Sequence, residues 1–144
     1  MKSAIFALAL LHPPTEVPDG WTVKQWNQFV ASAKLGKVIL EQKDIQSYDA
    51  THAELTLTED GSKKMRANRI PFGGKVFVIT LGERRLLGGM FLEISSERPL
   101  RFPVGYWMDG GPQVILRLRP QHSVHNDTKV PEEFLPELHR QFSN

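Results

Sequence analysis

Short apolar runs separated by glycine- and proline-rich turns limit the folds that this sequence can form. Most of these runs have the length of a strand and are rich in β-branched or aromatic residues. Runs of strands with few helical crossovers favour a mostly antiparallel sheet over a doubly wound parallel one. We therefore expect an α+β fold, in which two helices and a short C-terminal helix pack a mostly antiparallel sheet. The expected strands cover residues 3–11, 38–40, 53–57, 75–81, 86–94, 102–108 and 114–118.

Two of these runs differ in a way that predicts their place in the sheet. Residues 3–11 are apolar at almost every position, which is typical of a central strand covered on both faces. Residues 53–57 instead alternate between polar and apolar side chains, which indicates one exposed face. Gly88-Gly89 lies inside a predicted strand and indicates a bulge or a close approach of another part of the chain.

The first residues also resemble a signal peptide, because Lys2 precedes the apolar run. The run stops at His12-Pro13-Pro14 without a nearby small-x-small cleavage site, which favours a buried strand. A targeting segment and a buried strand both stay open as alternatives, and the protein is expected to be cytoplasmic if Met1 is the native start. No apolar run reaches the roughly 18 residues that a membrane span needs.

Helix signals occur at three places. Thr22 and Gln25 have the spacing of a capping box, so we expect a helix over residues 22–35 with Gly36 as its C-terminal cap. A second helix is expected to begin at Thr58-Glu59-Asp60, with Met65 as its main apolar anchor. Residues 43–49 indicate a tight turn or a single helical turn. The tail repeats Phe134, Leu138 and Phe142 at intervals of four, and Pro136 either splits this helix or starts its second piece.

Composition narrows the chemistry. The chain has 144 residues, the size of one domain, and we treat residues 1–144 as a single globular unit. It has no cysteine, which excludes disulfides, thiolate zinc sites and cysteine nucleophiles. Lys and Arg number 18 against 16 Asp and Glu, and this small excess gives little support for a nucleic-acid partner unless the basic residues share a face. We expect no cofactor.

Two clusters have the residue types of a metal or catalytic site. His122 and His125 are three residues apart and are followed by Asp127, although the local sequence is typical of a loop. Asp49, His52 and Glu54 also lie close in sequence, but Asp49 fits a turn better than a general acid–base pair. No Gly-x-Ser-x-Gly elbow supports a serine nucleophile, and Gly73-Gly74-Lys75 lacks the rest of a phosphate loop. We therefore assign no catalytic, metal or cofactor residues.

Arginines and aromatic residues form the best candidate for a partner-binding surface. Tyr106 and Trp107 are neighbours in a predicted strand and must point to opposite faces, so at most one is core if the sheet has one wet face. Trp26 is expected in the core. The predicted surface consists of Tyr106, Trp107, Arg84, Arg85, Arg117 and Arg119. A wider basic set, interleaved with acids, would favour nucleic acid if it converged: Lys63, Lys64, Arg66, Arg69, Arg98 and Arg101.

The stretch from Val38 to about Val104 resembles a known family. The residues that carry the resemblance are 38–40, Asp44-Ile45, the segment Leu55-Thr56-Leu57-Thr58-Glu59-Asp60-Gly61, the segment 74–79, 89–91, Ser95-Ser96 and Pro103-Val104. Together they are similar to the head subdomain of the first periplasmic region of the SecD protein-export subunit and to related stand-alone bacterial domains. Gly82-Glu83 reverses the acidic-glycine pair that this family usually has in its hairpin turn. The resemblance implies a compact α+β fold, an extracytoplasmic bacterial ancestry and a binding role without catalytic residues.

Three functions follow as hypotheses. The leading one is a non-enzymatic module that binds a protein or peptide through a sheet edge or through the surface around Tyr106 and Trp107. The second is a nucleic-acid-associated domain that uses the basic residues. The third is a small hydrolase or metal-binding protein with its site near His52 or His122. The sequence does not determine the oligomeric state.

Overall fold

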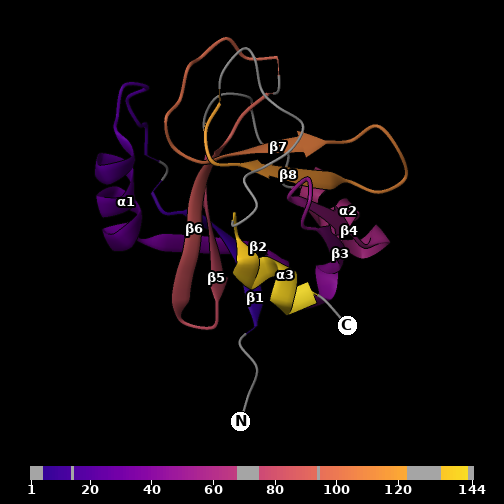
Figure 1. Cartoon of the computed structure of the whole chain (residues 1–144). Helices are drawn as coiled ribbons and strands as arrows, with labels where there is room; N and C mark the ends of the chain where they lie inside the picture. Colours follow the sequence, from indigo (N-terminus) through magenta and orange to yellow (C-terminus); the bar gives the residue numbers. More distant parts are fainter. Residues whose placement is uncertain (1–4, 14, 68–74, 94, 123–133, 143–144) are drawn as a thin grey trace.

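The structure is a computed structural model, and it describes residues 5–13, 15–67, 75–93, 95–122 and 134–142 (Figure 1). Within these residues, eight strands form one sheet in the order β2-β1-β5-β6-β7-β8-β4-β3. Every neighbouring pair is antiparallel except β6 and β7. The strands are β1 (Phe6–Leu11), β2 (Leu35–Glu41), β3 (Ile45–Asp49), β4 (Glu54–Leu57), β5 (Val76–Leu81), β6 (Arg84–Phe91), β7 (Val104–Met108) and β8 (Ile115–Arg119).

Three α-helices accompany the sheet in the described part of the chain: α1 (Val23–Ser32), α2 (Glu59–Ala67) and α3 (Pro136–Phe142). A single 3-10 turn, η1 (Gln42–Asp44), joins β2 to β3. The expected α+β fold with a mostly antiparallel sheet, two helices and a short C-terminal helix is confirmed. Pro136 is the first residue of α3, which decides between the two alternatives for the tail.

The capping box of α1 forms as expected. The backbone N–H of Gln25 donates to Thr22 Oγ1 over 3.2 Å, and the backbone N–H of Thr22 donates to Gln25 Oε1 over 2.8 Å. The predicted C-terminal end was wrong, because α1 stops at Ser32 and Gly36 lies inside β2. The helix was expected to reach residue 35, but Leu35 already pairs with Leu11 of β1 and belongs to the sheet.

The turn expected over residues 43–49 is shorter than predicted. The helical turn η1 ends at Asp44, and the strand β3 begins at the next residue, Ile45. The carboxylate of Asp44 holds this turn: its Oδ2 accepts from the backbone N–H of Glu41 over 2.9 Å and from Lys64 Nζ over 3.0 Å. The second pair ties η1 to α2. Thr58 caps α2 through Oγ1, which accepts from the N–H of Gly61 over 3.0 Å, and Met65 is its buried anchor.

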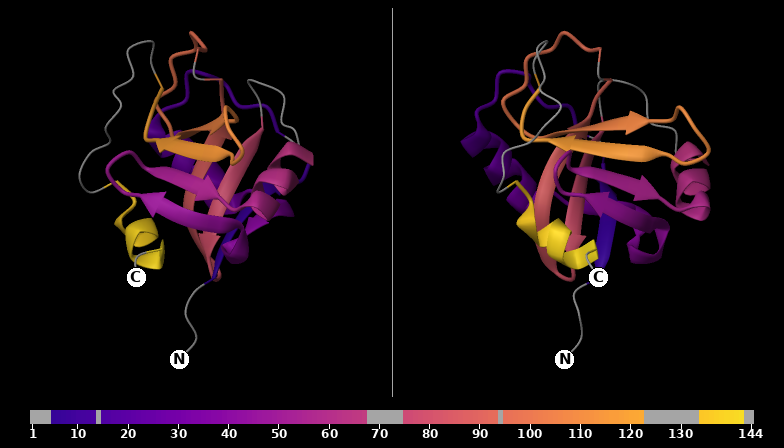
Figure 2. Two further views of the ribbon diagram at one scale, coloured as in Figure 1. Left: turned by 90° about the vertical axis from the view of Figure 1, so that its right-hand side faces the viewer. Right: turned by 45° about the vertical axis from the view of Figure 1, so that its right-hand side comes forward.

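The sheet curls strongly, because its two edge strands are consecutive in sequence. β2 and β3 lie at opposite ends of the strand order, yet the three residues of η1 connect them, and three residues span only about 10 Å. The two ends must therefore come close to one another. In Figure 1, β7 and β8 run almost crosswise to β5 and β6, and Figure 2 shows the same curl from two other sides.

Curling creates two separate cores. The inner core lies inside the curl and includes Phe6, Phe77, Leu55 and Leu116, all fully buried. α3 packs onto it, and the ring centroids of Phe142 and Phe6 are 5.4 Å apart. The outer core lies on the other face of β5, β6 and β7, under α1 and the segment before β7. Its buried members are Leu11, Val17, Trp26, Val30, Val76, Val78, Met90, Leu92, Leu100, Phe102, Val104 and Tyr106.

Candidate binding site

The six residues of the predicted partner-binding surface do not lie together on the surface. Tyr106 belongs to the outer core with only 1% of its area exposed, and its hydroxyl bonds to His122. Arg119 is 3% exposed and donates from Nη1 to the carbonyls of His52 and Leu118. Burial is the main reason that its pKa is lowered, followed by the charge of Arg117. Trp107 is half-buried against the inner core.

The other three arginines of that predicted surface bind parts of this chain. Arg84 forms an ion pair with Glu137 of α3 over 2.9 Å. Arg117 of β8 pairs with Glu54 of β4 over 2.7 Å, directly across the two strands. Arg85 donates from Nη1 to the carbonyl of Val30 over 2.7 Å, which satisfies a free carbonyl near the C-terminal end of α1. These side chains therefore stabilise contacts between elements.

Four members of the wider basic set also form ion pairs within the chain, namely Lys63 with Glu59, Lys64 with Asp44, Arg66 with Asp109 and Arg98 with Asp19, whereas Arg101 is exposed. Arg66 binds both carboxylate oxygens of Asp109, over 3.0 and 2.8 Å, and these hydrogen bonds are the main reason that the pKa of Asp109 is lowered. Arg98 likewise binds Asp19 through two hydrogen bonds, which lower the pKa of that carboxyl. Arg69 lies outside the described residues. Pairing of this kind neutralises most of these charges in the described residues and so weakens the support for a phosphate-binding face.

The two histidine clusters do not form a catalytic or metal centre among the described residues. His52 Nδ1 donates to Asp49 Oδ2 over 2.8 Å in an exposed turn, and this bond lowers the pKa of Asp49, whereas Glu54 pairs with Arg117 instead. His122 is buried. Its Nε2 donates to the carbonyl of Ser96 over 2.7 Å, so its Nδ1 accepts from the hydroxyl of Tyr106. His125 and Asp127 lie outside the described residues, and nowhere in the described part do three His, Asp or Glu side chains gather.

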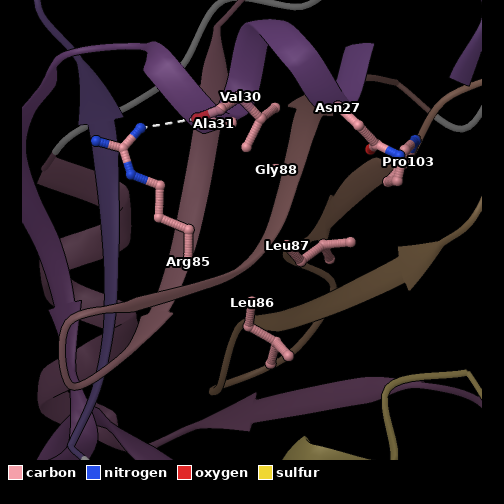
Figure 3. A pocket seen from close by; sticks show the side chains of 8 residues that line it. All are labelled: Asn27, Val30, Ala31, Arg85, Leu86, Leu87, Gly88 and Pro103. Atoms are coloured by element: carbon pink, nitrogen blue, oxygen red, sulfur yellow. Dashed lines mark hydrogen bonds between the residues drawn. The ribbon is translucent and has the colours of Figure 1, made fainter. Parts of the chain in front are cut away.

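The candidate site is instead an apolar groove of about 260 Å³ between α1 and β6 (Figure 3). The close approach of these two elements depends on Gly88. A Cβ at this position would come within 2.3 Å of Val30 Cγ2, so any side chain would push α1 away from the sheet. The indole N–H of Trp26 donates to the carbonyl of Gly88 over 2.9 Å and fixes the helix there. Of the two alternatives predicted for Gly88-Gly89, a bulge or a close approach, the close approach is found at both glycines, where the side chains of Val30 and Phe77 occupy the space of a Cβ.

Eight residues line this groove, and we call it the α1–β6 groove. They are Asn27, Val30, Ala31, Arg85, Leu86, Leu87, Gly88 and Pro103.

The lining of the α1–β6 groove is suited to binding and lacks the groups for catalysis. It is mostly aliphatic, and Leu86 and Leu87 extend to the same side of β6 (Figure 3). Its polar groups are the amide of Asn27 and the guanidinium of Arg85, which turns away to the carbonyls of α1. No lining side chain can serve as a general base or as a usual metal ligand. The volume lies just under the 300–1,000 Å³ that is usual for small-molecule pockets, and it fits one or two apolar side chains.

Sequence reasoning found part of this groove. It placed Trp26 in the core and a close contact at Gly88-Gly89, and both are confirmed. It missed Asn27 and Ala31, which lie four residues apart on the exposed side of α1 and carry no distinctive chemistry. Only the packing of α1 on β6 brings these side chains to one place.

Comparisons with known proteins add no name to this site. No family model matches the chain, and searches of curated proteins and of solved structures find no match. The resemblance to the SecD head subdomain therefore stays a prediction. Among the described helices, none has the length and apolar character that a membrane crossing requires.

Proposed function

We propose that this chain is a non-enzymatic module that binds a protein or peptide, and that the α1–β6 groove holds an apolar side chain of that partner. The observation that carries the proposal is an open, mostly aliphatic groove whose only charged lining group already bonds to the chain's own carbonyls. At protein interfaces, buried apolar anchors in such pockets supply most of the binding free energy. A binding role is also what the resemblance to the SecD family implies.

Substitutions on the exposed side of α1 can test the groove without disturbing either core. Ala31 lines the groove and is exposed, whereas its neighbour Ser32 is exposed but does not line it. Ala31→Glu brings a carboxylate into the apolar groove, where burying it under a ligand is costly. Ser32→Glu adds the same charge to the last turn of the same helix and is the matched control.

The experiment selects partners from a displayed library of random dodecapeptides and measures the selected peptides by fluorescence anisotropy. We expect enrichment of sequences with a large aliphatic or aromatic anchor. Ala31→Glu should weaken their binding at least about tenfold, while Ser32→Glu leaves it within about twofold. No enrichment over an unrelated control protein, or equal binding by both variants, would overturn the proposal. So would salt-sensitive binding of a single-stranded oligonucleotide that survives Ala31→Glu, which would favour the nucleic-acid alternative.

A further inference from the structure

The first residues of β6 contact both helices that flank this strand. Arg84 forms an ion pair with Glu137 of α3 over 2.9 Å. The next residue, Arg85, donates from Nη1 to the carbonyl of Val30 in α1 over 2.7 Å. Figure 1 shows β6 between α1 and α3. We call Arg84–Leu87 the linking segment, because this part of β6 joins the two helices.

The aliphatic floor of the α1–β6 groove belongs to the same segment. Leu86 and Leu87 line the groove (Figure 3). Both side chains are half-buried and also pack against the inner core. α3 and the residue before it supply Leu138 and Leu135 to that core, with 0% and 8% of their area exposed. The two leucines of the groove therefore pack on the same apolar cluster that α3 completes.

Strand pairing alone does not fix the linking segment. The register of β5 and β6 shifts within it, so Leu86 is an extra residue on β6 without a partner on β5. β7 pairs with β6 only beyond this segment, at Met90 and Phe91. The positions of Leu86 and Leu87 therefore depend strongly on the inner core and on α1, which pack against them from two sides.

The attachment of α3 combines apolar anchors with weak polar contacts and a strained residue. In its ion pair with Glu137, the Arg84 side chain is 66% exposed, so solvent screens the attraction. Gln141 Nε2 donates to Gln42 Oε1 over 2.9 Å. Leu135, directly before the helix, has a φ of 53°, a left-handed conformation that is unfavourable for residues other than glycine. Release of α3 relieves this strain, so the short helix is suited to alternate between a docked and a released state.

From these contacts we infer that α3 regulates the α1–β6 groove, which binds its peptide strongly while α3 is docked and weakly once α3 is released. The inference rests on the proposed function and specifies how that site is controlled. Release removes the ion pair of Arg84 and takes Leu138 out of the inner core. Leu86 and Leu87 then lose part of their support, and the groove loses its fixed floor.

A charge on the buried side of α3 tests the inference. Leu138→Asp places a carboxylate at a fully buried position, so it should release α3. Arg140→Asp places the same residue on the exposed side of the same helix and is the matched control. The probe is a library-selected dodecapeptide whose binding is weakened by Ala31→Glu. By fluorescence anisotropy, Leu138→Asp should bind it about fivefold or more weakly than the wild type, and Arg140→Asp within about twofold.

Hydrogen exchange in the wild-type chain provides the reciprocal measurement. Coupling between two sites acts equally in both directions, so the bound peptide must favour the docked helix by the factor that release costs in affinity. The backbone N–H of Leu138 donates to the carbonyl of Leu135 over 3.1 Å, and its exchange reports on α3. Saturating peptide should slow this exchange about fivefold or more. The N–H of Thr51, which donates to Asp49 in an exposed turn of the second half of the sheet, should be unaffected.

The outcomes separate the inference from the function on which it rests. If peptides bind in a way that depends on Ala31, but Leu138→Asp binds them as tightly as the wild type or more tightly, the function stands and regulation by α3 is wrong. The same conclusion follows if saturating peptide leaves the exchange of α3 unchanged. If circular dichroism shows that Leu138→Asp does not fold, the exchange measurement on the wild type decides alone. If no peptide depends on Ala31, the proposed function fails and the inference fails with it.

Discussion

The two halves of the curled sheet are stabilised in different ways. The first half, β2-β1-β5-β6, has the inner core on one face and the outer core under α1 on the other. In the second half, β7-β8-β4-β3, the apolar side chains of β4 and β8 alternate with polar ones. Leu55 and Leu116 enter the inner core, whereas Glu54 and Arg117 pair on the opposite face.

This difference shows why the candidate groove lies beside the first half. A strand that is buried on both faces needs a second element packed against its outer face, and for β6 this element is α1. The helix comes close to β6 because Gly88 has no side chain. The mostly aliphatic α1–β6 groove lies beside this contact. In the second half, the charged pair Glu54–Arg117 instead lies on the outer face of β4 and β8. Binding and stability therefore depend on different side chains.

The largest expected effect is the loss of Trp26. This side chain is fully buried, stacks on Phe102 with ring centroids 4.1 Å apart and an interplanar angle of 7°, and donates to the Gly88 carbonyl. Trp26→Ala should lower the free energy of unfolding by about 3–5 kcal/mol, measured by urea denaturation.

Trp107 provides the matched control in the second half. It is half-buried, and its indole N–H has no hydrogen-bond partner in the described structure. Trp107→Ala should cost less, about 1–3 kcal/mol. Equal losses for the two variants would contradict the view that the first half depends more on apolar packing.

Sequence patterns predicted this distinction between halves better than they predicted the strand order. The apolar run of residues 3–11 and the alternation in residues 53–57 indicated a covered strand and a half-exposed one, and β1 and β4 confirm both. The strand order was not predictable, because it depends on η1, a three-residue turn that joins the two ends of the sheet. Nothing in residues 42–44 alone indicates that the strands on either side of them, β2 and β3, lie at opposite ends of the sheet.

The predicted binding surface shows the same limit for side chains. The pattern required Tyr106 and Trp107 to face opposite sides, and they do, since Tyr106 enters the outer core and Trp107 packs on the inner one. Which of them is fully buried depends on tertiary packing: Tyr106 contacts His122, which lies 16 residues further along the chain. Arginine positions likewise cannot show whether an acid elsewhere in the chain will pair with them. The sequence therefore predicted the helix α1 and the strand β6, but not the groove between them.

A smaller effect is expected from the cross-strand pair that is typical of the second half. Glu54 and Arg117 lie directly opposite each other, and their side chains are 18% and 22% exposed. A double-mutant cycle with Glu54→Gln and Arg117→Gln should give a coupling free energy of about 0.5–1 kcal/mol that decreases in high salt.

The helical pair Glu59–Lys63 is the control for that cycle. Its atoms are 3.8 Å apart and its side chains are mostly exposed, so its coupling should be about 0.3 kcal/mol or less. A Glu54–Arg117 coupling that is no larger than this control would show that the outer face of the second half does not depend on its charged pair.

The smallest effect at neutral pH is expected from Tyr48, at the edge of the second half. Its hydroxyl is buried without a hydrogen-bond partner in the described structure, so Tyr48→Phe should leave the free energy of unfolding unchanged or raise it by up to about 1 kcal/mol. Burial, and then the negative charge of Asp49, raises the pKa of Tyr48 to about 12, while Arg119 opposes the shift.

Between pH 10 and 12 the native state therefore keeps a proton that the unfolded state releases, and native stability falls as pH rises. Tyr48→Phe should remove the part of this decrease that Tyr48 causes. In parallel urea titrations, the free energy of unfolding of the variant should therefore exceed that of the wild type by an amount that grows from pH 9 to pH 11. Tyr106→Phe provides the contrast, because the Tyr106 hydroxyl bonds to His122 and its removal should cost about 1 kcal/mol at neutral pH. Tyr48→Phe could instead destabilise the protein at neutral pH as much as Tyr106→Phe does. That result would show that the Tyr48 hydroxyl forms a hydrogen bond, and it would contradict the prediction.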